Sequence, residues 1–259
     1  MKRLAFAAAW FLALTIAERR WPLRRPSNSP NRRLVINAVV GAVGFGSLAV
    51  LYEIVVPRAV RWSETRQLGL LRWLGVPAWL AAPAAIVLLD YTLWHWHWLN
   101  HRVPILWRFH GAHHADLDLD ASTAIRFHPG ELVFSVPFRA AQVVLLGVAL
   151  GPLLLWETLV FIGVQFHHSN LRLPARLDRA LGYVVITPRI HGIHHSRRPR
   201  ELHSNFGTLL SIWDRLHGLR IENVPQDSIV IGLPHQRERR ALGASASLSL
   251  PFARKVPNR

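Results

Sequence analysis

The sequence contains no cysteine. This absence excludes disulfide bonds, cysteine-ligated iron–sulfur clusters, thiolate-bound haem and cysteine-type zinc sites. Any metal ion must therefore be held by imidazole, with or without oxygen ligands. A nucleotide-binding fingerprint is also missing, because Gly41, Gly44 and Gly46 neither match the dinucleotide motif nor sit in a strand–turn context. We therefore expect no flavin or nicotinamide to be bound by this chain.

Acidic residues are scarce as well. The 15 aspartates and glutamates face 31 lysines and arginines, which gives a net charge of +16. The arginines crowd the ends of apolar segments, where they would meet anionic lipid headgroups. A nucleic-acid-binding protein would instead gather its basic residues on a surface with few apolar runs. The charge pattern thus argues against nucleic acid as a partner and favours a membrane surface.

Apolar residues are abundant, at 51% of the chain, which is ordinary for a multi-pass membrane protein. Residues 4–17 are apolar but short, and no cleavage site follows them. They predict a short first membrane segment or a half-inserted anchor rather than a signal peptide. Residues 34–56 are long enough to cross a bilayer, and small residues in them would let another helix approach closely.

Two further apolar stretches complete the predicted bundle. In residues 68–96, Pro77 and Pro83 are expected to kink or divide the helix. Residues 132–168 exceed one span, and Gly151–Pro152 predicts a turn between helices 132–150 and 153–168.

The predicted fold is all-α, a multi-pass membrane helix bundle of about four to five spans with a cytosolic helical, histidine-rich cap. Three regions are expected: N-terminal anchor segments and a basic loop in 1–67, a catalytic domain in 68–220, and a basic tail in 221–259. The arginine-rich loop 18–33 indicates the cytoplasmic side, and this topology places every clustered histidine there. Because arginine greatly outnumbers lysine, we expect a bacterial inner membrane.

Clustered histidines carry the chemistry of this sequence. An H-x-x-x-H motif starts at residue 97, and H-x-x-H-H motifs start at residues 110 and 191. Residues three or four apart share one face of a helix, so each motif is expected to direct its rings at a common point. His168 ends the last apolar span and is a further candidate ligand, with His167 as the alternative at that position. The candidate metal ligands are His97, His101, His110, His113, His114, His168, His191, His194 and His195.

Four other residues are candidates for supporting the ligands. Asp90 lies seven residues before the first ligand and could accept its second ring N–H, or only cap or snorkel. Glu157 is an ionisable group within an apolar span, which suggests a function, although a protonated or snorkelling glutamate beside the turn is an alternative. His128 could join the site or cap the next helix, and Asn170 follows His168. The isolated histidines are interpreted as surface or structural residues: His203, His217 and His235.

Eight or nine imidazoles are too many for one ion, so the residues predict two metal ions. Imidazole suits zinc, copper, iron and nickel alike. The clusters lack the carboxylates that a hydrolase uses as a base or a bridge. Iron that activates oxygen against a C–H bond of a lipid-soluble substrate fits better. The alternatives are a membrane zinc hydrolase and a non-enzymatic metal-binding or transport protein; transport would predict ionisable groups throughout the spans.

Six motifs occur in order between about residues 86 and 220. They are D-x(6)-H-x-x-x-H from Asp90, L-W-x-x-H-x-x-H-H from Leu106, R-F-H-P-x-E from Arg126, H-S-N from His168, T-P-x-x-H-x-x-H-H from Thr187, and S-N-F-G with W-D-R from Ser204. This series resembles the fatty acid hydroxylase/sterol desaturase superfamily of membrane-bound non-haem di-iron oxygenases. Two departures are Trp98, where the family often has arginine, and His217–Gly218 in place of F-G.

The resemblance implies that the eight motif histidines bind two iron ions, with His168 as an additional ligand. It implies O2 as co-substrate and a lipid substrate, such as a sterol or a fatty acyl chain, that is hydroxylated or desaturated. It also implies an external electron donor, a ferredoxin, cytochrome or reductase, which the arginine-rich cap could attract electrostatically.

Overall fold

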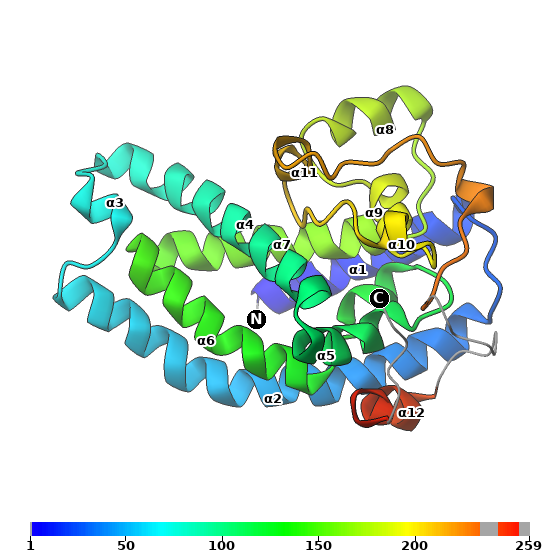
Figure 1. Cartoon of the computed structure of the whole chain (residues 1–259), viewed down its shortest axis with the longest axis horizontal. Coiled ribbons are helices and arrows are strands. Elements are labelled where there is room, and N and C mark those ends of the chain that lie inside the picture. Colours follow the sequence, from blue (N-terminus) through cyan, green and yellow to red (C-terminus); the bar gives the residue numbers. More distant parts are fainter. Residues whose placement is uncertain (1, 234–242, 254–259) are drawn as a thin grey trace.

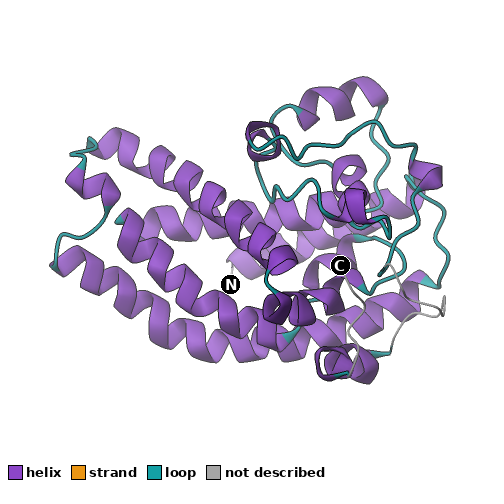
Figure 2. Cartoon of the chain, in the orientation of Figure 1, coloured by secondary structure: helices purple, strands orange, loops and turns teal. Residues whose placement is uncertain are grey.

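The computed structural model describes residues 2–233 and 243–253, with side chains from residue 5 on. Within these residues the chain forms α- and 3-10 helices and no β-strand, as Figure 2 shows, so the all-α prediction is confirmed. Backbone pairing between distant segments is limited to three isolated bridges, at Pro22–Leu171, Val185–Leu210 and Ser196–Ile231.

Five long helices form an elongated bundle, and most of the shorter helices lie at one end of it, whereas the short helix that follows α2 lies at the opposite end (Figure 1). The long helices are α1 (Lys2–Arg20), α2 (Pro30–Thr65), α4 (Ala78–Arg102), α6 (Pro129–Leu146) and α7 (Leu150–His168). The shorter ones are α3 (Leu70–Trp73), α5 (Pro104–His114), η1 (Ala121–Ile125), α8 (Ala175–Gly182), α9 (Pro188–His194), α10 (Pro199–Leu202), α11 (Ile212–Leu216), η2 (Gln226–Ser228), α12 (Ala244–Ser249) and η3 (Leu250–Phe252).

Two helical segments among the described residues are long and apolar enough to cross a membrane, judged by length and composition. They are Pro30–Trp73 and Leu150–His168. The bundle also leaves many large apolar side chains exposed, among them Val35, Val50 and Leu155. An apolar exterior on long helices is what a lipid environment requires. The two apolar segments and the exposed apolar side chains therefore indicate a membrane protein.

Four of the helices around the site begin at a proline. A proline occupies the first helical position of α2, α5, α6 and α9, where its missing N–H leaves no bond unmade and its fixed φ suits a helix: Pro30, Pro104, Pro129 and Pro188. The residue before proline is driven to an extended conformation. Val103 accordingly has φ −90° and ψ 118°. This break between α4 and α5 lets the histidines of the two helices face one another.

The turn that joins α6 to α7 differs from the predicted one. Gly147 ends α6 in the left-handed conformation, with φ 75°, and α7 begins at Leu150. Gly151 and Pro152 lie inside the first turn of α7, where proline is tolerated because the first N–H groups of a helix have no partner. Pro77 does precede α4 as expected, but Pro83 is accommodated within that helix.

Close packing of α2 depends on two glycines that the sequence singled out. A Cβ on Gly41 would lie 2.7 Å from the Ile125 carbonyl oxygen, and one on Gly44 would lie 2.5 Å from that of Phe127. Gly46 has open space around it. α2 therefore approaches the segment that leads into α6, and it packs beside α6 along the bundle. A cavity lies within the bundle and is lined by residues of α2, α4, α6 and α7.

A buried ionic network fixes the loop that follows α5. Arg33 of α2 donates two hydrogen bonds to Asp116, at 2.9 and 2.7 Å, and also pairs with Asp120. Burial alone would raise the pKa of Asp116, but the Arg33 guanidinium outweighs that effect and holds the pKa below its usual range. The network ties the start of α2 to the end of the helix that carries three candidate ligands.

Replacing Asp116 by alanine is expected to lower the free energy of unfolding by about 3–5 kcal/mol, because it leaves the buried Arg33 guanidinium poorly compensated. Denaturant or thermal unfolding of the purified protein in detergent measures this change. The exposed Asp227 provides the control, since its replacement by alanine should stay within about 0.5 kcal/mol. A loss at Asp116 no larger than at Asp227 would contradict the assignment.

Candidate metal centre

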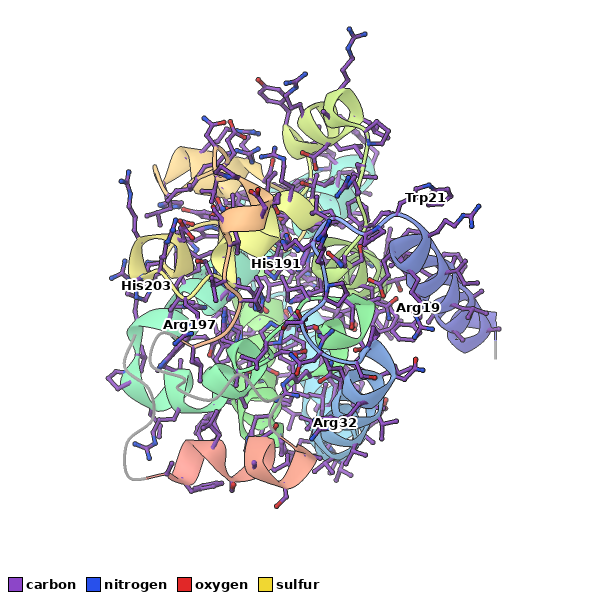
Figure 3. All side chains as sticks on the ribbon, turned by 90° about the vertical axis from the view of Figure 1, so that its right-hand side faces the viewer. Arg19, Trp21, Arg32, His191, Arg197 and His203 are labelled. Atoms are coloured by element: carbon purple, nitrogen blue, oxygen red, sulfur yellow. The ribbon has the colours of Figure 1, made fainter. Side chains whose placement is uncertain are left out.

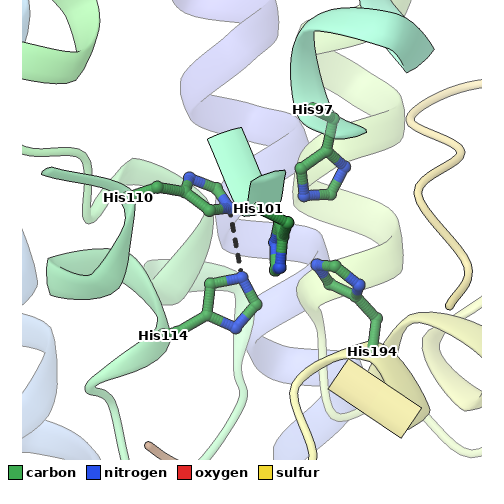
Figure 4. A group of neighbouring side chains, drawn as sticks. All are labelled: His97, His101, His110, His114 and His194. Atoms are coloured by element: carbon green, nitrogen blue, oxygen red, sulfur yellow. Dashed lines mark hydrogen bonds between the residues drawn. The ribbon is translucent and has the colours of Figure 1, made fainter. Parts of the chain in front are cut away.

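The chain brings nine histidines from distant segments into two adjacent groups. Within each group one ring nitrogen from every residue lies within 4.8 Å of the others. Group A is His97, His101, His110, His114 and His194, and group B is His113, His168, His191 and His195. Figure 4 shows the rings of group A pointing at a common centre from separate helices. In the end-on view, His191 of group B lies amid the packed side chains, whereas Arg19 and Trp21 lie towards the edge (Figure 3).

Each H-x-x-H-H motif is divided between the groups instead of converging on one point as predicted. In α5, His110 and His114 belong to group A and His113 to group B. In α9 the assignment is reversed, because His194 alone joins group A. The two groups touch, since the rings of His114 and His195 stack with centroids 4.3 Å apart. The arrangement provides two neighbouring centres that share the same two short helices.

Hydrogen bonds to the outer ring nitrogens fix the orientation of several rings. Nδ1 donates to a backbone carbonyl oxygen in His97 (2.8 Å), His168 (2.8 Å) and His194 (2.7 Å). A carbonyl oxygen can only accept, so in these neutral rings Nε2 keeps its lone pair and faces the interior. The polypeptide thus sets the tautomer that a metal ion requires.

The distances between inner nitrogens fit ions held by imidazole. Nε2 atoms are 3.0 Å apart in the pairs His168–His113 and His191–His168, and 3.1 Å apart in His195–His191 and His114–His110. Two nitrogens bound at right angles to one ion, each at about 2.1 Å, would lie about 3.0 Å apart. Nε2 of His194 is buried and has no hydrogen-bond partner among the described residues. These nitrogens could hold one ion in each group.

Burial keeps the cluster neutral. Desolvation, followed by repulsion from neighbouring imidazoles, lowers the pKa of His113, His191 and His195 well below 6.5. All three rings are therefore uncharged at pH 7. The neutral imidazole is the form that binds a metal ion.

These pKa shifts predict an acid-sensitive metal-free protein. Below pH 6.5 the unfolded chain binds protons that the buried rings cannot, so stability falls as the pH drops, by about 1.4 kcal/mol per pH unit and histidine. Burial raises the pKa of Glu18 to about 7, which acts in the opposite direction, but carboxyls of this kind are outnumbered. We expect the melting temperature of chelator-treated protein to change little between pH 7.5 and 6.5 and to fall progressively from pH 6.5 to 5.5. A flat profile would show that the rings are not buried in neutral form.

The predicted supporting residues have other partners. Asp90 accepts hydrogen bonds from the indole of Trp213 in α11 (2.7 Å) and from the backbone N–H of Leu210 just before that helix (3.1 Å), and from no histidine among the described residues. His128 caps α6, because its Nδ1 accepts the backbone N–H two residues on at 2.9 Å. Asn170 clamps the backbone of Arg24 through both amide atoms, at 2.9 and 2.8 Å. All three hold loops in place around the site.

The remaining candidates also lie outside groups A and B. The ring of His167 is 4.0 Å from that of His191, centroid to centroid, but offers no nitrogen to either group. Glu157 lies within the bundle, where it accepts a hydrogen bond from Tyr52. His203 and His217 belong to neither group, and His235 lies outside the described residues.

Sequence reasoning missed the role of Glu131. Its Oε1 lies 2.8 Å from Nδ1 of His110, and its Oε2 is buried without a hydrogen-bond partner in the described part of the chain. Glu131 therefore makes the carboxylate–imidazole contact that the sequence suggested for Asp90. The available signal was the acidic residue of the R-F-H-P-x-E motif, which no local spacing connects to His110.

An apolar cavity of about 270 Å³ reaches both groups from within the bundle. Its walls come from α2, α4, α6 and α7, and its apolar lining includes Leu48, Leu93, Phe138, Val160 and Phe161. Histidines of both groups close one end, and Glu131 lines it too. A lipid chain in this cavity would meet the imidazoles in surroundings that exclude water.

A buried multi-histidine centre at the end of an apolar helix bundle defines the class of this protein. The family model for fatty acid hydroxylases matches residues 82–219, which is more than half of the chain and spans every histidine of groups A and B. The chain belongs to the fatty acid hydroxylase family.

Several curated relatives share this segment. Ornithine lipid hydroxylase OlsE of Rhizobium tropici is 35% identical over 174 residues, 66% of this chain and 50% of the relative. Alkylglycerol monooxygenase of Xenopus tropicalis is 27% identical over 57% of this chain and 31% of the relative. Cholesterol 25-hydroxylase of Homo sapiens is 30% identical over 54% of this chain and 52% of the relative. The matches thus span about half of these relatives or less, and no solved structure matches.

Proposed function

We propose that this protein is a membrane-bound di-iron oxygenase that hydroxylates or desaturates a lipid, using O2 and electrons from a separate donor. The observation that carries the proposal is the pair of buried imidazole groups at the end of an apolar cavity. Membership of the fatty acid hydroxylase family supports it. The names of the three relatives, two hydroxylases and a monooxygenase, support it as well.

In this proposal the nine histidines of groups A and B hold two iron ions, and bound iron supplies the activation of O2 for attack on a C–H bond. The residues of the chain perform the other tasks. Neutral rings present Nε2 inward, and Glu131 orients His110 through Nδ1. The apolar walls bring the lipid chain to the histidines and exclude water, which favours oxidation over hydrolysis.

We further propose that α2, α4, α6 and α7 cross the membrane, with α1 as a short additional segment, and that residues 68–220 form the catalytic domain. The histidines then lie at the cytoplasmic end of the bundle, because the arginine-rich segment between α1 and α2 lies at the same end. An acidic electron donor, such as a ferredoxin, cytochrome or reductase, would meet the basic cap there.

Metal analysis combined with isotope labelling tests this function. Protein purified under anaerobic conditions should contain about two iron ions per chain, as two imidazole groups imply. Lipid extracts of cells with and without the gene, grown under isotope-labelled O2, should differ in a lipid that carries the label or in one with a new double bond. Zinc alone, together with a product whose oxygen comes from water, would show a hydrolase and overturn the proposal.

A further inference from the structure

The cavity that reaches the histidines has a second polar group at its other end. Arg139 of α6 and Glu157 of α7 both line the cavity. Most of the candidate ligands lie on other helices, namely α4, α5 and α9. Glu157 precedes His168 by eleven residues on the same helix, which places the two roughly 16 Å apart along its axis. The walls between these ends are predominantly apolar.

These groups form a connected network. Arg139 lies over the ring of Trp156, 4.1 Å from its centroid, and its Nε is 3.5 Å from Glu157 Oε1. Tyr52 of α2 donates its hydroxyl to the same oxygen. Arg139 Nη1 donates to Gln142 at 2.6 Å. Within the described residues, no protein group bonds Arg139 Nη2 or Glu157 Oε2, and the two side chains keep 17% and 27% of their area accessible.

An ion pair in the interior of a membrane-spanning bundle is costly, and such pairs usually mark a functional site. A network that served only to hold the helices together would be dry and fully satisfied. This one instead presents a guanidinium donor and a carboxylate acceptor to the space that also contains the histidines. Donor and acceptor together match a group that both donates and accepts.

We propose that Arg139, Glu157 and Tyr52 form a binding subsite for an uncharged hydrogen-bonding group of the lipid substrate. The inference rests on the proposed function, and it narrows the substrate class. The subsite pairs opposite charges, so it offers no net attraction to an ionic headgroup, and a charged headgroup would have to enter the bundle at high cost. The substrate is thus a lipid with a hydroxyl or amide group separated by an apolar stretch from the carbon that is oxidised.

Binding of a matched pair of probes tests the subsite without any turnover. Tritiated dodecanol and dodecane share an alkyl chain and differ in the hydroxyl group. Their affinity for the full-length protein in nanodiscs is compared with that for Glu157→Gln and Tyr52→Phe. Both substitutions keep the shape of the side chain. They should weaken the binding of dodecanol about tenfold, which is the effect of one hydrogen bond to a charged group, and leave the affinity for dodecane unchanged.

The control is Phe161→Leu, in the apolar wall, which should alter the affinity for both probes alike. Melting temperatures show whether each variant folds. If the network were purely structural, Glu157→Gln and Tyr52→Phe would lower the melting temperature and change the affinity for both probes equally. That result would overturn the proposed subsite. Unchanged dodecanol affinity in both variants would overturn it too.

The position of oxidation gives a second measurement. With an anchored hydroxyl, products from dodecanol and tetradecanol should be oxidised at the same carbon counted from the hydroxyl end. Positions that are constant from the methyl end would overturn the subsite but leave the oxygenase intact. If the protein bound dodecanol selectively but oxidised no lipid, the subsite would be supported and the proposed function would be wrong.

Discussion

Alanine at His113 or at His194 is expected to abolish lipid oxidation and to lower the bound iron from about two ions to about one or fewer per chain. The two residues belong to different groups, and each directs an inner nitrogen at its group. His113 Nε2 lies 3.0 Å from His168 Nε2, and His194 Nε2 is buried without a hydrogen-bond partner in the part of the chain that the structure describes. The free energy of metal binding depends on every ligand, so the loss of one ring should weaken or abolish metal binding by that group.

Metal analysis and lipid product analysis of the purified variants measure these effects. The control is His217→Ala, because His217 is exposed and belongs to neither group. It should keep both iron and activity. Melting temperatures of the chelator-treated variants separate loss of iron from loss of fold, since removal of one neutral buried ring should leave the metal-free protein folded. If all three variants behaved alike, the assignment of the ligands would be wrong.

Local patterns in the sequence were enough to predict the helical class and to select the nine clustered histidines. Helical spacing of three and four residues depends only on the geometry of one element, so it is visible without tertiary structure. The split of His110, His113 and His114 between two groups is not visible in this way. It depends on where α4, α7 and α9 contact α5, and these contacts join residues far apart in the chain.

The expectations that failed involve similar limits. Gly151–Pro152 and Gly147 are both turn signals, and only the positive φ at Gly147 decides between them. Asp90 is placed seven residues before His97, but this spacing does not reveal that the indole N–H of Trp213 donates a hydrogen bond to its carboxylate. Glu131 lies 21 residues after His110, and no periodic pattern links an acid to a ring at that distance.

Glu131→Gln is expected to reduce iron affinity and turnover by about 10–100-fold, the usual consequence of losing a carboxylate behind a metal-bound histidine. The carboxylate accepts the Nδ1–H of His110 at 2.8 Å, so it holds the ring in place with Nε2 directed at group A. Glutamine can still accept that hydrogen bond, but without the charge. It would also place an amide N–H₂ near the position of Oε2, an atom that is buried and makes no hydrogen bond within the described residues.

Competition with a chelator measures the iron affinity, and turnover is measured at saturating iron so that the two effects can be separated. Asp227→Asn is the matched acid-to-amide control at an exposed position and should change neither quantity. A positioning role for Glu131 requires that the glutamine variant lose iron affinity while its metal-free melting temperature stays within a few degrees of the unaltered protein. If the variant kept iron affinity and turnover within about twofold, His110 would not depend on Glu131, and the hydrogen bond between them would serve packing alone.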